Sequence, residues 1–259
     1  MIRYVDNAEM INRENLLETC CGRKILSYLE AYGTGYDFCR FYINDSGSVF
    51  LLINSTLLIV GKEFDREELV TFTQMNSPFR IEGSDRAIEL MTGMEGYQKL
   101  HRTIFKLRAD ENNVIDENDI NFEPKLDDVY EILAEGFPNL LDYPLWLADT
   151  SHRVRHGLSK VFSYKDSTTA SLVYDMNGYV LVGQVATKLS ARGSGYARVF
   201  LKWLTKYISE QNKTAFLYAL DTRESFYREI GFEVYNDEYV LERTDDKHES
   251  TEKGKLNCI

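Results

Sequence analysis

The sequence is poor in the residues that form disulfides and bind metals, and it has no long apolar run. Its 259 residues include 4 cysteines and 4 histidines, and the cysteines have neither a Cys-x-x-Cys redox spacing nor a metal-ligand spacing. The most apolar stretch, residues 49–60, is shorter than the roughly 20 residues that cross a bilayer. Asp6 and Glu9 stand where a signal peptide needs an apolar core. We therefore expect reduced thiols, no metal and a cytoplasmic protein.

Positive charge is also scarce. The chain has 30 Lys and Arg against 41 Asp and Glu, a net charge of −11. Nucleic acids and anionic membranes both select a basic surface, so we expect neither as a partner. The hydrophobic content of 44% and aromatic content of 13% exclude a mainly disordered chain. The length fits one large domain or two small ones.

The first part of the chain predicts an α+β domain. A helix-compatible segment at residues 8–31 precedes a strand at 38–43. A turn and two further strands follow at 49–53 and 56–60, and Asp65 begins a helix. A strand at 79–82, a helix at 86–91 and a strand at 97–107 complete this part.

The boundary between domains is predicted from composition. Residues 108–121 are rich in acids and poor in bulky apolar side chains, which is typical of a linker. We therefore expect one domain at residues 1–115, a second at 116–245, and a charged tail at 246–259.

The second domain is predicted to contain a mixed sheet. After helices at 126–137 and 145–156, strands are expected at 161–164, 170–174 and 179–186, the last two joined by an Asn177-Gly178 hairpin turn. Elements expected after them are a helix at 195–211, a strand at 215–219, a helix at 223–230 and a closing pair of strands. The helix at 195–211 makes a crossover, so the strands on either side of it should be parallel.

The turn Arg192-Gly193-Ser194-Gly195, between a strand and a helix, predicts an anion site. Glycines let backbone N–H groups point toward one centre, and the helix N-terminus adds partial positive charge. The turn lacks the Gly-Lys-Ser/Thr of a Walker A loop and the third small residue of a dinucleotide fingerprint. The glycines alone are therefore weak evidence for a particular ligand.

Charge around this turn supports the same interpretation. Residues 176–209 contain no Asp or Glu, whereas the chain average of 41 in 259 gives about five acids for 34 residues. Arg198, Lys202 and Lys206 follow one another at i, i+4 and i+8 on one helix face. This window suits an anionic ligand, although a buried strand and its helix also tend to lack acids.

Two motifs resemble those of the GNAT superfamily of N-acetyltransferases. Residues 192–197, Arg-Gly-Ser-Gly-Tyr-Ala, fit the pattern Gln/Arg-x-x-Gly-x-Gly/Ala. Residues 225–233, Ser-Phe-Tyr-Arg-Glu-Ile-Gly-Phe-Glu, are similar to the second signature, Phe-Tyr-x-x-x-Gly-Phe. The resemblance covers residues 122–243 and is strongest to the subgroup related to glycine N-acyltransferase. It implies an α+β GNAT fold and transfer of an acetyl group from acetyl-coenzyme A (acetyl-CoA) to a primary amine, by direct transfer.

The resemblance also assigns roles to residues. Tyr227 corresponds to the tyrosine that protonates the departing coenzyme A thiolate, and Arg192 adds a charge-assisted contact to the pyrophosphate. Relatives often carry a cofactor-binding Asn before this Tyr, where this chain has residues 220–223, Leu-Asp-Thr-Arg. The residues expected to bind the cofactor are Val185, Ala186 and Thr187 on the strand, and Arg192, Gly193, Ser194, Gly195, Tyr196, Ala197 and Arg198 on the turn and helix.

Several alternatives remain open from the sequence. Asp149, His152 and His156 share a helix face and are candidates for the general base, but no third ligand makes the histidines a metal site. The acceptor is a small amine or an amino acid, with a peptide amine as an alternative, and a homodimer is open. The first domain resembles a degenerate, non-catalytic GNAT repeat, or is an unrelated α+β domain. The alternative function is a non-catalytic acyl-CoA-binding regulatory module.

Overall fold

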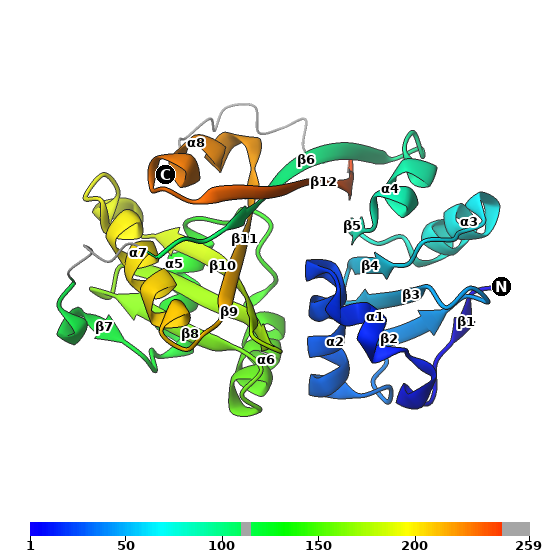
Figure 1. Cartoon of the computed structure of the whole chain (residues 1–259), viewed down its shortest axis with the longest axis horizontal. Coiled ribbons are helices and arrows are strands. Elements are labelled where there is room, and N and C mark those ends of the chain that lie inside the picture. The colour runs from blue at the N-terminus through cyan, green and yellow to red at the C-terminus, as the bar shows by residue number, and fades with distance from the viewer. Residues whose placement is uncertain (110–114, 245–259) are drawn as a thin grey trace. The chain divides into compact units, whose positions relative to one another are not determined.

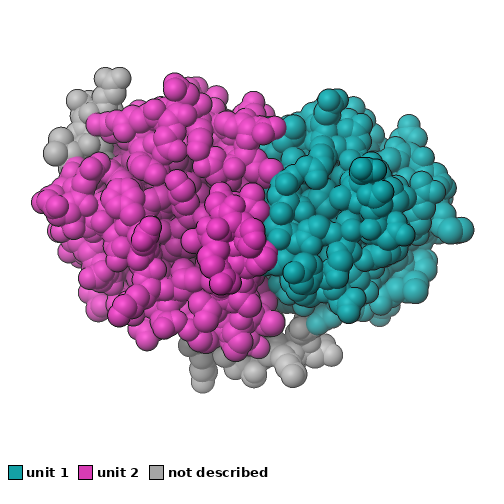
Figure 2. Space-filling model, turned by 90° about the horizontal axis from the view of Figure 1, so that it is seen from below, with its two compact units in different colours: residues 1–102, 237–256 teal, residues 103–236, 257–259 magenta. Residues whose placement is uncertain are grey.

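The computed structural model describes residues 1–109 and 115–244 (Figure 1), and the expected tail at 246–259 lies outside them. The chain divides into two compact units (Figure 2). Unit 1 contains Met1–Arg102 and the segment from Asp237, whereas unit 2 contains Thr103–Asn236. The units therefore interleave in sequence, a feature that a single boundary after residue 115 does not describe. No helix of the described residues is long and apolar enough to cross a membrane.

Unit 1 is built from a sheet and four helices that occur early in the chain. The turn between two of its strands places Asn54 in the left-handed region, at φ 50°. Asp65 caps a helix by accepting a hydrogen bond from the Glu68 N–H, as the sequence predicts. Its elements are β1 (Arg3–Tyr4), α1 (Arg13–Leu17), α2 (Cys20–Tyr32), β2 (Cys39–Ile43), β3 (Val49–Ile53), β4 (Thr56–Val60), α3 (Arg66–Asn76), β5 (Arg80–Gly83), α4 (Asp85–Met91) and the start of β6 (Tyr97–Lys106).

Unit 2 repeats the same order of helices and strands. The predicted Asn177-Gly178 turn is present, with φ values of 49° and 77°. The elements are β7 (Ile120–Asn121), α5 (Leu126–Ala134), α6 (Tyr143–Arg155), β8 (Lys160–Tyr164), β9 (Thr168–Met176), β10 (Tyr179–Thr187), α7 (Tyr196–Ser209), β11 (Thr214–Leu220), α8 (Asp221–Glu229) and β12 (Glu233–Arg243). The mixed α+β fold and the tandem repeat predicted from the sequence are thus confirmed.

The sheet topology of each unit contains one parallel pair. In unit 1 the strand order is β1-β2-β3-β4-β5-β12, and β4 and β5 are parallel. In unit 2 the order is β6-β11-β10-β9-β8-β7, and β10 and β11 are parallel, as the crossover helix predicts. A helix therefore joins the two parallel strands in both units.

The two halves of the chain exchange their last strands. In unit 1, β5 pairs antiparallel with β12, with Leu241 opposite Ile81. In unit 2, β11 neighbours β6, and the Leu107 N–H just after β6 donates to the carbonyl of Ala215 over 2.9 Å. The closing pair of strands expected near the C-terminus is therefore one long strand, β12.

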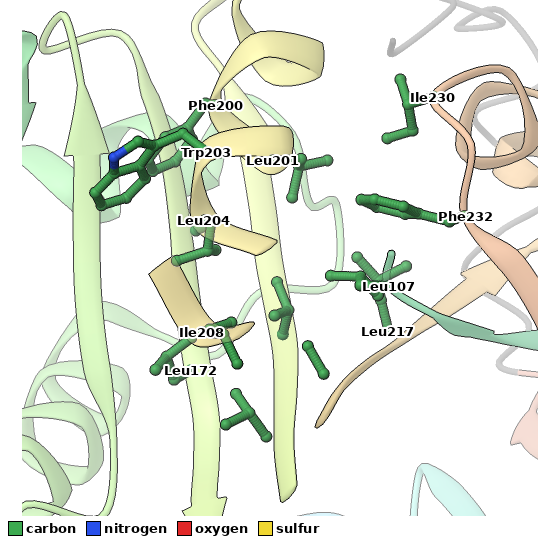
Figure 3. Close-up of a cluster of buried hydrophobic side chains, with 14 of the residues drawn as sticks. Leu107, Leu172, Phe200, Leu201, Trp203, Leu204, Ile208, Leu217, Ile230 and Phe232 are labelled. Carbon is green, nitrogen blue, oxygen red and sulfur yellow. The ribbon is translucent and has the colours of Figure 1, made fainter. Parts of the chain in front are cut away.

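Helices cover both faces of the unit 2 sheet. On one face α7 packs with strand residues such as Leu172 and Leu217 (Figure 3). Its buried hydrophobic side chains are Phe200, Leu201, Trp203, Leu204 and Ile208. On the other face α5 and Trp146 of α6 pack against Val161 and Ala186. These two layers fix the positions of the ends of β10 and β11.

Candidate functional site

The parallel strands β10 and β11 pair over only part of their length. Their register runs from Tyr179 opposite Thr214 to Val182 opposite Leu217 and stops there. Beyond that point residues 183–187 of β10 do not pair with residues 218–220 of β11. On its other side β10 stays paired with β9 up to Thr187. The edge of β10 that faces β11 therefore offers unpaired backbone groups near the carboxyl ends of both strands.

A β-bulge in β10 lies at the point where the pairing with β11 ends. The register with β9 shifts between Gly183 and Ala186, and Gln184 has a φ of 51°, in the left-handed region. The Gln184 side-chain oxygen accepts a 2.9 Å hydrogen bond from the Ser171 hydroxyl. A bulge bends its strand, so β10 turns away from β11 just before Val185, Ala186 and Thr187.

The loop after β10 is held by Arg192. Its guanidinium donates to the carbonyl of Thr187 over 3.1 Å and to the carbonyl of Glu135, after α5, over 2.9 Å. The Glu135 carboxylate in turn accepts from the Leu189 N–H. The side chain of Arg192 therefore fixes the loop to β10 and α5, and this fastening occupies two of its donors.

The glycines of the loop leave backbone donors open. Gly193 and Gly195 have φ values of 80° and 75°, and a Cβ at either would meet no atom within 4 Å. Gly195 precedes α7, which has no side-chain N-cap and no acid in its first turn. None of the hydrogen bonds among the described residues uses the backbone N–H groups of residues 193–198. These donors and the helix dipole suit an anion.

The side chains around the first turn of α7 are partly engaged. Ser194 is exposed, whereas Tyr196 and Ala197 are half-buried. Arg198 forms a 2.9 Å ion pair with Glu229 of α8, and both side chains are largely exposed. Such a pair contributes little free energy, so a ligand phosphate can displace Glu229 at small cost.

Tyr227 lies on α8 in an apolar environment. Its residue is 8% exposed, and its ring lies 5.6 Å from that of Phe105 on β6 and 6.3 Å from that of Phe232. Burial raises the pKa of Tyr227 to about 12, and the positive charge of Arg223 acts in the opposite direction. Within the described residues its hydroxyl has no hydrogen-bond partner, so it is free to donate to a ligand.

The three candidates for the general base lie on or beside the C-terminal half of α6. Asp149 pairs with Arg153 over 3.6 Å, and Arg153 also donates to the Val173 carbonyl of β9. The rings of His152 and His156 are 4.2 Å apart, and His156 Nδ1 lies 2.8 Å from the His152 carbonyl. The described residues contain no cluster of three or more metal-ligating side chains.

The structure brings the predicted cofactor residues and Tyr227 to one edge of unit 2, where β10 and β11 end. The cofactor candidates lie on β10, the loop and α7, and Tyr227 lies on the helix that follows β11. The bulge at Gln184 was not predictable, because a glutamine in a strand does not indicate a positive φ. Two further residues were missed: Glu135, which holds the loop, and Arg223, which acts on Tyr227.

A scan against protein-family models found no match, and a search of curated proteins found none either. Solved structures, however, match most of the chain. A GCN5-related N-acetyltransferase from Sphaerobacter thermophilus is 19% identical with a TM-score of 0.59, covering 94% of this chain and 95% of that one. One from Kribbella flavida is 14% identical with a TM-score of 0.59, covering 90% and 99%.

A Drosophila protein is 11% identical with a TM-score of 0.58, covering 94% of this chain and 98% of that one. Identities this low show the fold alone. This chain therefore has the GNAT acetyltransferase fold over most of its length, in agreement with the resemblance of residues 192–197 and 225–233.

Proposed function

We propose that unit 2 binds an acyl-CoA, with acetyl-CoA as the donor, and transfers its acyl group to a primary amine. The observation that carries the proposal is the open end of the β10–β11 pair beside the uncapped N-terminus of α7. Ligands of α/β sheets bind outside the carboxyl ends of parallel strands, and both features lie there. Within the GNAT fold we propose the subgroup related to glycine N-acyltransferase.

The donor would be held mainly by backbone groups. The N–H groups of residues 193–198 would donate to the pyrophosphate, and the free edge of β10 at Val185, Ala186 and Thr187 would pair with the pantetheine amides as an added strand does. Arg192 would mainly support the loop, because its guanidinium already donates to the carbonyls of Thr187 and Glu135. Arg198 is the side chain placed to add a charge, once its pair with Glu229 opens.

Tyr227 would serve as the proton donor for the leaving group. When an amine nitrogen bonds to the thioester carbonyl carbon, the C–S bond breaks and sulfur keeps its electron pair. The Tyr227 hydroxyl would protonate this thiolate, and the proton lost by the amine would restore the phenol through solvent. The reaction is then direct, with no acyl-enzyme, and the general base on α6 stays a candidate among Asp149, His152 and His156.

The acceptor is proposed to be a small primary amine or an amino acid. Unit 1 is proposed to be non-catalytic, because the loop before α3 lacks the Gly-x-Gly of the loop before α7. The alternative is that unit 2 binds acyl-CoA without transferring the acyl group, which the missing Asn near residues 220–223 favours.

The proposal is tested by ligand-dependent melting followed by turnover. Saturating acetyl-CoA should raise the melting temperature, because it binds the native state alone. Release of the coenzyme A thiol should then depend on one member of a panel of amines and amino acids. A melting shift without thiol release from any amine supports the binding module, and no shift contradicts both functions.

A further inference from the structure

Arg223 lies at the same sheet edge as the proposed cofactor site. It is in the first turn of α8, three residues after β11 ends at Leu220, and the pairing of β11 with β10 ends before that, at Leu217. Tyr227 is one helical turn further on, at i+4, so the two side chains share a face of α8. The arginine thus follows the open end of the strands directly.

Arg223 is a half-buried cation without a counter-charge. Three other arginines near this part of unit 2 form ion pairs: Arg228 with Glu224, Arg198 with Glu229, and Arg108 with Glu233. No ion pair or hydrogen bond among the described residues involves the Arg223 guanidinium, whose one described interaction is with the Tyr227 phenol. A guanidinium that no carboxylate neutralises keeps its full positive charge for a neighbouring group, and the side chain that follows it on the same helix face is that of Tyr227.

The other neighbours of the Tyr227 ring are uncharged. The ring packs against Phe226 on its own helix, Phe105 on β6 and Phe232 after α8. Arg228, whose guanidinium carbon lies 6.0 Å from the Phe105 ring centre, is tied to Glu224. Arg108 and Glu233, from the ends of β6 and β12, pair with each other over 2.7 Å and are largely exposed. In the described part of unit 2, Arg223 is therefore the one charge that acts on the phenol.

We propose that Arg223 is a positioning residue that acts through Tyr227, keeping a positive charge beside the phenol while its proton passes to the departing thiolate. This inference rests on the proposed function. The O–H bond of Tyr227 breaks, the S–H bond of coenzyme A forms, and the negative charge that the thiolate carried moves to the phenolate oxygen. A cation beside that oxygen stabilises the product of the proton transfer. The proton released by the amine then restores the phenol.

The sign of the effect follows from the two opposing influences on Tyr227. Burial disfavours the phenolate and raises the pKa, while the Arg223 charge favours the phenolate and lowers it. Loss of the arginine leaves burial unopposed, so the phenol becomes a weaker acid. A weaker acid transfers its proton to the leaving group more slowly.

The test compares Arg223→Met with Arg223→Lys, which keeps the charge, and with Arg228→Met, the matched control on α8. Each full-length protein carries a fluorinated tyrosine in place of Tyr227, because fluorine lowers the phenol pKa into a range that leaves the protein folded. Fluorine NMR then follows the ionisation of that one phenol without any substrate. In parallel, kcat and the KM for acetyl-CoA are measured in the unfluorinated variants with Tyr227 intact.

We expect Arg223→Met to raise the pKa of the fluorinated phenol. Arg223→Lys, which keeps the charge, should hold that pKa close to the wild-type value, and Arg228→Met should leave it unchanged. With Tyr227 intact, Arg223→Met should lower kcat roughly tenfold with a nearly unchanged KM for acetyl-CoA, since the effect is on proton transfer. A phenol that titrates identically in wild type and Arg223→Met overturns the inference whatever the activity. So does an unchanged kcat.

The proposed function and this inference fail in different ways. If wild-type protein shows no melting shift with acetyl-CoA and releases no thiol, acyl transfer is wrong, and the role of Arg223 in it falls too. The fluorine titration still reports whether the two side chains are electrostatically coupled. If wild type is active and the titration shows no coupling, the proposed function stands and only Arg223 loses its role.

Discussion

The two units share an order of helices and strands but differ at the equivalent strand pair. In unit 1, β4 and β5 pair from Thr56 to Ile59, and the Ser84 N–H extends the ladder by donating to the Ile59 carbonyl. In unit 2 the pairing of β10 with β11 ends after Val182, five residues before β10 does. The equivalent parallel strands are thus hydrogen-bonded to their ends in unit 1 and separate before their ends in unit 2.

The helices that join the two parallel strands, α3 in unit 1 and α7 in unit 2, differ in a matching way. The N-terminus of α3 is capped by the Asp65 carboxylate and has Glu67 and Glu68 in its first turn. The carbonyl of Glu63 in the preceding loop accepts hydrogen bonds from Asn44 and Ser48. The N-terminus of α7 has no side-chain cap and no acids. In unit 1 the Asp65 carboxylate thus already binds one of the helix donors, and two further acids lie in the same turn, whereas unit 2 leaves the equivalent position for a ligand.

Unit 1 also contains a buried charge network. Glu82 of β5, whose side chain is 4% exposed, pairs with Lys24 of α2 over 3.0 Å and with Arg102 of β6 over 3.2 Å. Arg102 also binds Glu238 of β12, and Arg80 binds Glu242. These pairs join three strands and one helix. The comparison teaches that the unit whose parallel strands stay paired also holds a buried network formed by its own charged side chains.

The largest expected effect is on acetyl-CoA affinity, and it comes from removing the difference between the N-termini of α3 and α7. Gly195→Glu should weaken acetyl-CoA binding by roughly a hundredfold or more, because the carboxylate repels the pyrophosphate and a side chain disfavours the φ of 75°. Isothermal titration calorimetry with acetyl-CoA measures the loss. The variant would make the α7 N-terminus acidic, as that of α3 already is.

Gly157→Glu is the matched control for this variant. Gly157 has a φ of 72° and open space around it, and it lies after α6, away from the loop. The same strain and charge there should leave acetyl-CoA affinity unchanged. If Gly195→Glu binds as tightly as Gly157→Glu, the pyrophosphate does not sit at α7.

The next effect concerns the buried charge network of unit 1. Glu82→Gln should lower the free energy of unfolding by ~3 kcal/mol at neutral pH, because Arg102 and Lys24 lose the carboxylate that compensates their buried charges. Urea denaturation measures this. Glu89→Gln, which breaks an exposed pair with Arg86, should cost less than ~0.5 kcal/mol. Equal stability of the two variants would mean that the network adds nothing.

The same variant gives a pH dependence. Burial alone would raise the pKa of Glu82, but the charges of Arg102, Lys24 and Arg80 outweigh burial and hold the pKa well below its usual range. Its stabilisation is therefore complete above the unfolded-state pKa of about 4.3 and is lost as the pH falls toward the folded-state pKa. The difference between wild type and Glu82→Gln should shrink from neutral pH to about pH 3. Burial and the Glu82 charge both raise the pKa of Glu238, so Glu238 acts with the opposite sign, and less strongly in Glu82→Gln than in wild type.

The smallest of the three effects tests the closure of β4 on β5. A Cβ at Gly83 would lie 2.3 Å from the Ile59 carbonyl oxygen, so Gly83→Ala must push the strands apart, at a cost of ~2 kcal/mol in the free energy of unfolding. Gly35→Ala is the control, since no atom lies within 4 Å of a Cβ there and its φ is not positive. Unchanged stability of Gly83→Ala in thermal and urea unfolding would show that the strands separate freely.

Local chemistry made much of this fold predictable. The Asn177-Gly178 turn, the Asp65 cap and the crossover between β10 and β11 follow from a few adjacent residues each, and all are present. The glycine turn at 193–195 likewise predicts the positive φ values and the helix N-terminus without a side-chain cap that the structure shows. The resemblance of residues 192–197 and 225–233 added the identity of the fold.

Features that depend on contacts far apart in sequence escaped the prediction. The exchange of β6 and β12 pairs residues more than 100 positions apart, such as Ile81 with Leu241 and Leu107 with Ala215, and no local pattern encodes that choice. The helix expected over residues 8–31 is in fact a short 3₁₀ turn, α1 and α2, because Asn12 and Thr19 each cap a new helix start. Residues 110–114 of the expected linker lie outside the described part of the chain.

The strand exchange has a consequence for the order of folding during synthesis. The edge of β5 that β12 covers stays without its partner until residues 240–242 have left the ribosome, although the rest of unit 1 has been complete since residue 102. An unpaired sheet edge invites pairing with other chains. The edge of β5 in the nascent chain is therefore open to pairing with other chains throughout the translation of unit 2. A stop codon before residue 237 would leave that edge unpaired permanently.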